Sequence, residues 1–116
     1  MARLDLAAPI DEPGAVAALS ALAQGARLRI FRTLVEAGPR GMTPGDLSQR
    51  LGIGSSTLSF HLKELTHSGL VSPQRDGRHL IYRPDIARMN ALLAYLTAHC
   101  CGGEDCGLSG AQPGCC

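Results

Sequence analysis

The stretch "GSSTLSFHLKELTHSGL" (residues 54–70) decides the fold, together with the overlapping stretch "LVSPQRDGRHLIYR" (residues 70–83). The first has leucines at helical spacing behind a cluster of hydroxyl residues, a pattern that predicts a helix. In the second, Asp76-Gly77 is a two-residue turn signal between two strand-like runs, and Pro73 places the first strand at a sheet edge. The sequence therefore predicts a helix that leads into a β-hairpin.

Apolar residues at helical spacing predict four further helices. These helices cover residues 11–23, 26–38, 42–52 and 84–99. The third has strong start signals, because Thr43 can cap it, Pro44 suits its first position, and Asp46 stands three residues after the cap. The resulting order, α-α-α-α-β-β-α, is that of a winged helix-turn-helix, a mostly α fold with a β-hairpin.

The composition agrees with one small helical domain. The chain has 116 residues, of which 45% are hydrophobic and only 3% aromatic, so leucine and alanine must fill most of the core. All five cysteines follow the last predicted helix, in a glycine-rich segment. We therefore divide the chain into a winged helix-turn-helix domain, residues 1–99, and a cysteine-rich tail, residues 100–116.

Positive charge is concentrated in the middle of the chain. The net charge is only +1, but residues 50–83 hold five Lys or Arg residues against two Asp or Glu residues. Double-stranded DNA would meet this segment, with the helix at residues 54–70 in the major groove and the hairpin tip on a phosphate or in the minor groove. The candidate DNA-binding residues are Ser55, Ser56, Thr57, Ser59, Lys63, Arg75 and Arg78.

Each of these features has a simpler interpretation. Ser-Ser-Thr before an apolar helix often only caps that helix, and arginines at a hairpin tip can protect a sheet edge in solvent. A winged helix can also bind protein instead of DNA. His61 is expected to be a structural hydrogen-bonding residue, and the arginines of the second helix are expected to face solvent or acidic partners. These arginines are Arg27, Arg29 and Arg32.

Enzymes and membrane proteins are not favoured. The sequence has no Ser-His-Asp order, phosphate-binding loop or paired carboxylates, so we expect no enzymatic activity and no small-molecule substrate. It has no signal-peptide pattern and no apolar run of the ~18 residues that would cross a bilayer. We therefore expect a cytoplasmic protein without a membrane partner.

Three segments resemble the ArsR (ArsR/SmtB) family of metalloregulatory transcriptional repressors. They are "SSTLSFHLKELTHSGLV", which is similar to the family's recognition helix, "RDGRHLIYR", which is similar to its wing, and "LAQGARLRIFRTL", which is similar to its second helix. The resemblance covers about residues 16–98. It implies a homodimer that pairs through its first and last helices, binds operator DNA and represses transcription until an inducer binds.

The resemblance also directs attention to the tail. "GMTPGDL" lacks the Cys-x-Cys of many arsenic sensors in the family, and the last helix lacks the zinc sensors' Asp-x-His and His pair. "CCGGEDC" (residues 100–106) is similar to the C-terminal cysteines of an arsenic-responsive subgroup, with one residue fewer between them. This similarity implies As(III) or Sb(III) as the inducer, held by the thiolates of Cys100, Cys101 and Cys106, and no constitutive cofactor. Three thiolates without a matching carboxylate favour a soft ion. Cys115 and Cys116 are candidates for an accessory site.

Other ligands and roles stay open at this point. His99 could complete a tetrahedral zinc site with three thiolates, although adjacent cysteines are uncommon in such sites. A redox signal or another thiophilic metal could replace the metalloid. The chain could also be a thiol or metal buffer that does not bind DNA.

Overall fold

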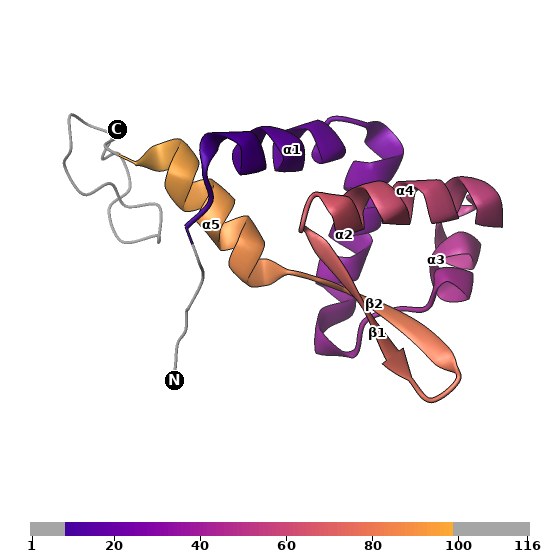
Figure 1. The fold of residues 1–116 in the computed structure, drawn as a ribbon. Coiled ribbons are helices and arrows are strands. Elements are labelled where there is room, and N and C mark those ends of the chain that lie inside the picture. Colours follow the sequence, from indigo (N-terminus) through magenta and orange to yellow (C-terminus); the bar gives the residue numbers. More distant parts are fainter. Residues whose placement is uncertain (1–8, 99–116) are drawn as a thin grey trace.

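The computed structural model describes residues 9–98, which form five α-helices, one 3-10 turn and a two-stranded sheet (Figure 1). The elements are α1 (Glu12–Leu22), α2 (Gly25–Ala37), η1 (Gly38–Arg40), α3 (Pro44–Leu51), α4 (Ser55–His67), β1 (Val71–Asp76), β2 (His79–Pro84) and α5 (Ile86–Thr97). This order confirms the predicted mostly α fold with a β-hairpin, a winged helix-turn-helix. His99 and all the cysteines lie outside the described residues.

The core is built from leucines, as the composition predicts. Leucines of α2, α3, α4 and α5 meet Ile30 and Phe31 in one buried cluster. The fully buried leucines are Leu34, Leu47, Leu58, Leu62, Leu65, Leu70 and Leu92. Because α3 and α4 each contribute leucines to this cluster, the core holds the two helices of the helix-turn-helix at a fixed angle.

Local signals set the helix-turn-helix. The hydroxyl of Thr43 accepts a hydrogen bond from the backbone N–H of Asp46 at 3.1 Å, which confirms the predicted cap of α3. The same helix ends at Gly52, whose left-handed backbone (φ 67°, ψ 31°) turns the chain toward α4. The last helix begins later than predicted, at Ile86, because Pro84 still pairs in β2 and Asp85 caps α5.

The hairpin differs from its prediction by one residue. The strands pair from Val71 opposite Pro84 to Asp76 opposite His79, so the two loop residues are Gly77 and Arg78 and not Asp76-Gly77. The strand ladder extends through Asp76, and the turn begins where glycine can adopt its positive φ of 64°. The wing therefore carries Arg78 at the turn itself.

The wing is attached to the helices through β2. Met42 and Tyr82 exchange two backbone hydrogen bonds, of 2.8 and 3.0 Å, across an isolated bridge. This contact requires Gly41, because a Cβ there would lie 2.6 Å from the Tyr82 carbonyl oxygen. The segment between α2 and α3 therefore fixes the hairpin relative to the helix-turn-helix.

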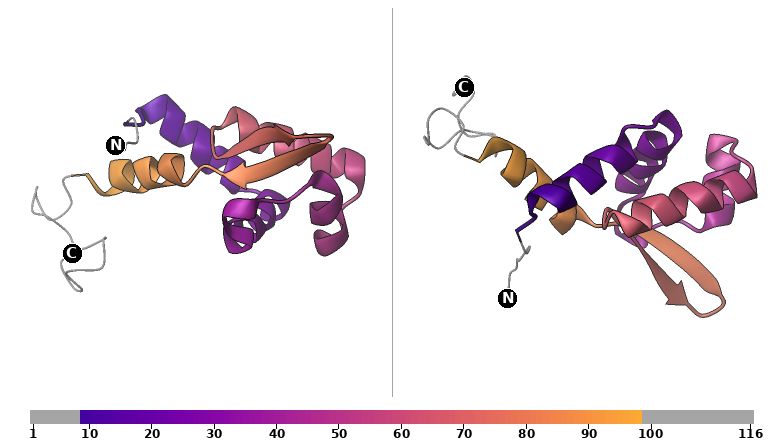
Figure 2. Two further views of the ribbon diagram at one scale, coloured as in Figure 1. Left: turned by 90° about the horizontal axis from the view of Figure 1, so that it is seen from below. Right: turned by 45° about the horizontal axis from the view of Figure 1, so that its top comes forward.

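The first helix buries its alanines and exposes larger apolar residues. Ala15, Ala18 and Ala21 are buried, whereas Val16 is 54% exposed and Leu19 is 43% exposed. Small side chains let α1 approach the neighbouring helices closely, and the branched side chains of Val16 and Leu19 point outward. In Figure 2, α1 and α5 lie together at one end of the molecule, and the hairpin lies toward the other end. No helix among residues 9–98 is both long and apolar enough to cross a membrane.

Candidate nucleic-acid interface

The five predicted DNA-binding residues of α4 are all exposed. The opposite side of the helix is buried through Leu58, His61, Leu62 and Leu65. The exposed set is Ser55, Ser56, Thr57, Ser59 and Lys63. Because the helix repeats about every 3.6 residues, Ser56, Ser59 and Lys63 share one side of it. The structure therefore brings Ser56, Ser59 and Lys63 together on a single polar surface of α4.

The hydroxyls at the start of α4 are not used as caps. Gly54 occupies the N-cap position, and no side chain accepts a hydrogen bond there. The other four α-helices between residues 9 and 98 are each capped by a side chain, namely Asp11, Gln24, Thr43 and Asp85. The interpretation of Ser-Ser-Thr as a simple helix cap is therefore wrong. The N-terminus of α4 is left with free backbone N–H groups and small hydroxyl side chains.

A hollow of about 510 Å³ lies along the junction of the two helices of the helix-turn-helix. Ser55 and Ser59 line it from α4, and Asp46 and Gln49 line it from α3. The carboxylate of Asp46 gives this hollow a negative edge, which disfavours a phosphate group. Contacts to an anionic backbone would therefore come from the open side of α4 and not from this hollow.

The wing tip carries two exposed cations. Arg75 and Arg78 are exposed, and neither forms an ion pair with another residue of the described part of the chain. Arg83, by contrast, is bound within the wing, where its Nε donates to the Pro39 carbonyl at 2.7 Å and its Nη1 donates to Gln74. Two of the three wing arginines are therefore available to a ligand.

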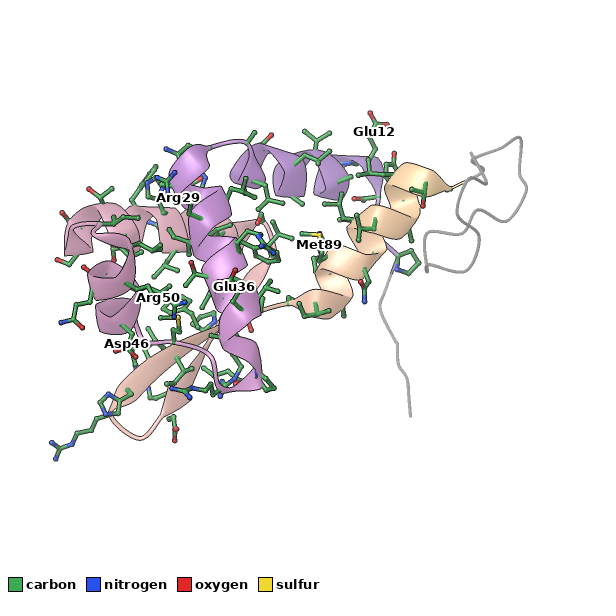
Figure 3. All side chains as sticks on the ribbon, turned by 180° about the vertical axis from the view of Figure 1, so that it is seen from behind. Glu12, Arg29, Glu36, Asp46, Arg50 and Met89 are labelled. Atoms are coloured by element: carbon green, nitrogen blue, oxygen red, sulfur yellow. The ribbon has the colours of Figure 1, made fainter. Side chains whose placement is uncertain are left out.

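The arginines of α2 have different surroundings. Arg32 pairs with Glu36 at 3.6 Å, and Arg50 of α3 reaches Glu36 at 4.0 Å; Figure 3 shows Glu36 and Arg50 beside each other and Arg29 away from them. Arg27 is half-buried and its guanidinium is bound within the fold, which differs from the prediction that it faces only solvent or an acid. Its Nε donates to the Ala21 carbonyl at 2.8 Å, and its Nη1 lies 3.4 Å from Nδ1 of His61.

His61 is a structural residue of α4, as predicted. It is buried, with 7% of its surface exposed, and Arg27 is its polar neighbour from α2. Burial lowers the pKa of His61, and the charge of Arg27 lowers it further, while Glu64 raises it. The neutral imidazole therefore links the recognition helix to α2 and, through Arg27, to the end of α1.

Two exposed residues on the polar side of α4 are not among the DNA-binding residues that the sequence predicted. Phe60 is 55% exposed, and His67 is also exposed. Phe60 follows Ser56 by four residues, and His67 follows Lys63 by four, so both belong to the same side of the helix. This spacing was the signal that could have identified them.

The predicted inducer site lies outside the described residues. The residues that lie outside are Cys100, Cys101 and Cys106 of the proposed site and Cys115 and Cys116 of the accessory pair. Between residues 9 and 98, no three His, Cys, Asp or Glu side chains are grouped so that they could hold a metal ion. Helix α5 ends at Thr97, and Ala98 after it has a non-helical backbone (φ −58°, ψ 132°). The cysteines thus follow the end of α5 in the sequence.

Comparisons with known proteins agree with this geometry. A helix-turn-helix domain family matches residues 22–74. The HTH-type transcriptional regulator YgaV of Escherichia coli is 33% identical over 82 residues, which are 71% of this chain and 81% of that protein. An ArsR-like transcriptional regulator from Rhodococcus has the same fold, with a TM-score of 0.66 and 26% identity over 72% of this chain and 76% of its own. The chain belongs to the ArsR family of winged helix-turn-helix transcriptional regulators.

A second solved structure bears on assembly. The homodimeric winged helix-turn-helix DNA-binding domain of Mb0332 from Mycobacterium bovis matches with a TM-score of 0.60 and 28% identity, over 75% of this chain and 81% of that one.

Like its relatives in the ArsR family, the chain is a DNA-binding transcriptional regulator and not an enzyme.

Proposed function

We propose that this ArsR-family regulator is a homodimeric repressor that binds double-stranded operator DNA and releases it when As(III) or Sb(III) binds thiolates of its tail. The DNA-binding part of the proposal rests on the exposed polar side of α4. This helix begins at an N-terminus that has no side-chain cap. The metalloid part rests on the cysteine pattern of the sequence.

The recognition helix and the wing suit complementary parts of a duplex. Small hydroxyls at Ser55, Ser56 and Thr57 allow close approach, and the free N–H groups of a helix start attract phosphate. Lys63 extends this surface by one positive charge per subunit. Arg75 and Arg78 at the wing tip would contact the backbone or the adjacent minor groove. Hydroxyl groups read base edges, and the cations fix the register.

Exposed apolar residues on α5 support a dimer. Ile86, Leu93 and Leu96 are each about half exposed, at 49%, 48% and 52%. With Met89 they form a stripe at spacings of three and four residues, the pattern by which helices pair. Val16 and Leu19 on α1, which contacts α5, are exposed apolar residues as well. A two-fold dimer through α1 and α5 would present two copies of α4 to a palindromic site.

The tail would couple inducer binding to this dimer contact. As(III) and Sb(III) take three sulfur ligands, which Cys100, Cys101 and Cys106 supply, while Cys115 and Cys116 form the accessory pair. Gathering three thiolates immediately after α5 would pull on the end of the dimerisation helix and change the angle between the two α4 helices. A 100-fold loss of operator affinity needs only ~2.7 kcal/mol of differential binding.

The test is a titration of the full-length protein on its own upstream DNA, followed by fluorescence anisotropy. Wild type should bind the duplex and release it when arsenite is added. Cys100→Ser with Cys101→Ser, and separately Cys106→Ser, should bind DNA normally and fail to respond. Cys115→Ser with Cys116→Ser is the matched control, and it should keep the response.

Two further outcomes separate the alternatives. X-ray absorption of the arsenite complex should report three sulfur neighbours, and fewer would contradict the three-thiolate site. Release by zinc or by a persulfide, with no effect of arsenite, would replace the inducer and leave the DNA-binding proposal intact. Failure of wild type to bind any duplex would overturn the function itself.

A further inference from the structure

One side chain on the polar surface of α4 does not match its neighbours. Phe60 is 55% exposed, whereas the residues around it on that side of the helix are Ser56, Ser59, Lys63 and His67. Isolated exposed apolar residues are common on protein surfaces, so exposure alone says little. The placement is informative, because Phe60 lies between Ser56 and Lys63 near the middle of the surface that would face DNA.

The ring of Phe60 has the ring of His61 as its aromatic neighbour. Its centroid lies 5.7 Å from that of the His61 ring, with the two planes at 60° in an edge-to-face arrangement. His61 is buried and has the Arg27 guanidinium 3.4 Å from its Nδ1. One edge of the exposed ring therefore lies beside a buried neighbour, and the rest of the ring is open to a ligand.

We propose that Phe60 reads thymine in the operator, by apolar contact between its ring and the C5-methyl group in the major groove. This inference rests on the proposed function, because it assumes that α4 enters that groove. Thymine is the only standard base with an apolar group on its major-groove edge, and a phenyl ring is among the side chains that recognise it. The hydroxyl and ammonium groups of Ser56, Ser59 and Lys63 recognise polar edges or phosphates, and Thr57 offers only a single methyl group beside its hydroxyl.

The experiment removes the methyl group without changing any hydrogen bond. A duplex is first selected from a random-sequence pool by the full-length wild-type protein. Each thymine of one half-site is then replaced by deoxyuridine, one at a time, and dissociation constants are measured by anisotropy. We expect one or two positions at which the replacement weakens binding about fourfold, the equivalent of one methylene-sized group withdrawn from burial. Replacement in both half-sites should weaken binding about sixteenfold.

A double-mutant cycle assigns the effect to the ring. Phe60→Ala should bind the selected duplex more weakly and should no longer distinguish thymine from deoxyuridine at those positions. Phe60→Leu, which keeps an apolar side chain, should retain part of the preference. Leu28→Ala is the matched control, since Leu28 is 46% exposed on α2 outside the α4 surface, and it should keep the full preference.

The possible outcomes distinguish a failure of the thymine proposal from a failure of the proposed function. If no thymine methyl affects wild-type binding, or if Phe60→Ala keeps the same methyl dependence, Phe60 does not read thymine, although the protein still binds DNA. If wild type selects no duplex from the pool, the proposed function fails and this inference fails with it. Circular dichroism of Phe60→Ala should show an unchanged melting temperature, because the side chain lies outside the core.

Discussion

The molecule has two exposed surfaces with opposite chemistry. On α4 the exposed side is polar and positive, with Ser56 and Lys63 around a single phenyl ring. On α5 and α1 it is apolar, with Leu93, Leu96 and Val16 each about half exposed. The exposed residues of these two surfaces do not belong to the buried core of residues 9–98. The difference indicates two kinds of partner: a polyanion at α4, and a second apolar surface, which a copy of the same chain offers, at α5.

The largest effect is expected from a charge on the apolar surface. We expect Leu93→Asp to produce a monomer that folds normally, because Leu93 is 48% exposed in the single chain. The monomer should bind operator DNA about 100-fold or more weakly, since its two half-site contacts are no longer linked. Light scattering after size-exclusion chromatography and anisotropy measure the two effects. Leu28→Asp, on α2, should change neither; a dimeric Leu93→Asp protein would show that α5 is not the interface.

The two sides of α1 can be distinguished by adding volume. Ala18 is fully buried, so Ala18→Leu should lower the free energy of unfolding by about 1–3 kcal/mol through overpacking. Ala17→Leu, on the exposed side of the same helix, should leave the stability nearly unchanged. Urea denaturation measures both variants. Equal stabilities would mean that α1 does not approach its neighbours as closely as its alanines indicate.

The polar surface is tested by its dependence on salt. Lys63→Ala should weaken operator binding about tenfold, and it should reduce the slope of log K against log salt by about one for each subunit. Lys63→Arg, which keeps the charge, should restore the slope. Anisotropy at several salt concentrations provides the data, and an unchanged slope for Lys63→Ala would place Lys63 outside the phosphate contacts.

The smallest expected effect concerns His61, the buried histidine of α4. The pKa of His61 is lowered in the fold from its ordinary value of 6.5 by burial and by Arg27. Between the folded and unfolded pKa values the unfolded chain binds more protons, so stability rises with pH through this window and is lost as pH falls below 6.5. His61→Gln should remove this part of the pH dependence of urea denaturation. A profile identical to that of wild type would show that His61 does not contribute to it.

Local chemistry made most of the fold predictable. Thr43 and Pro44 start α3 wherever the helix packs, and leucines at helical spacing identify the buried side of α4 because no other apolar pattern competes there. The turn was misplaced by one residue, because Asp76 was available both to the strand ladder and to the loop, and pairing with His79 decided between them. The N-cap at Gly54 could not be read either, since three hydroxyl residues follow it.

The sequence by itself determined the family fold, the order of its elements and the exposed polar side of α4, because helix periodicity, caps and turn residues act over a few neighbours. Only the tertiary structure decided which apolar side of α1 is buried, that Arg27 turns inward to His61, and that Phe60 remains exposed on the recognition helix. These three outcomes depend on how closely helices distant in sequence approach one another. That distance is set by the packing of the whole core and leaves no local signal in the chain.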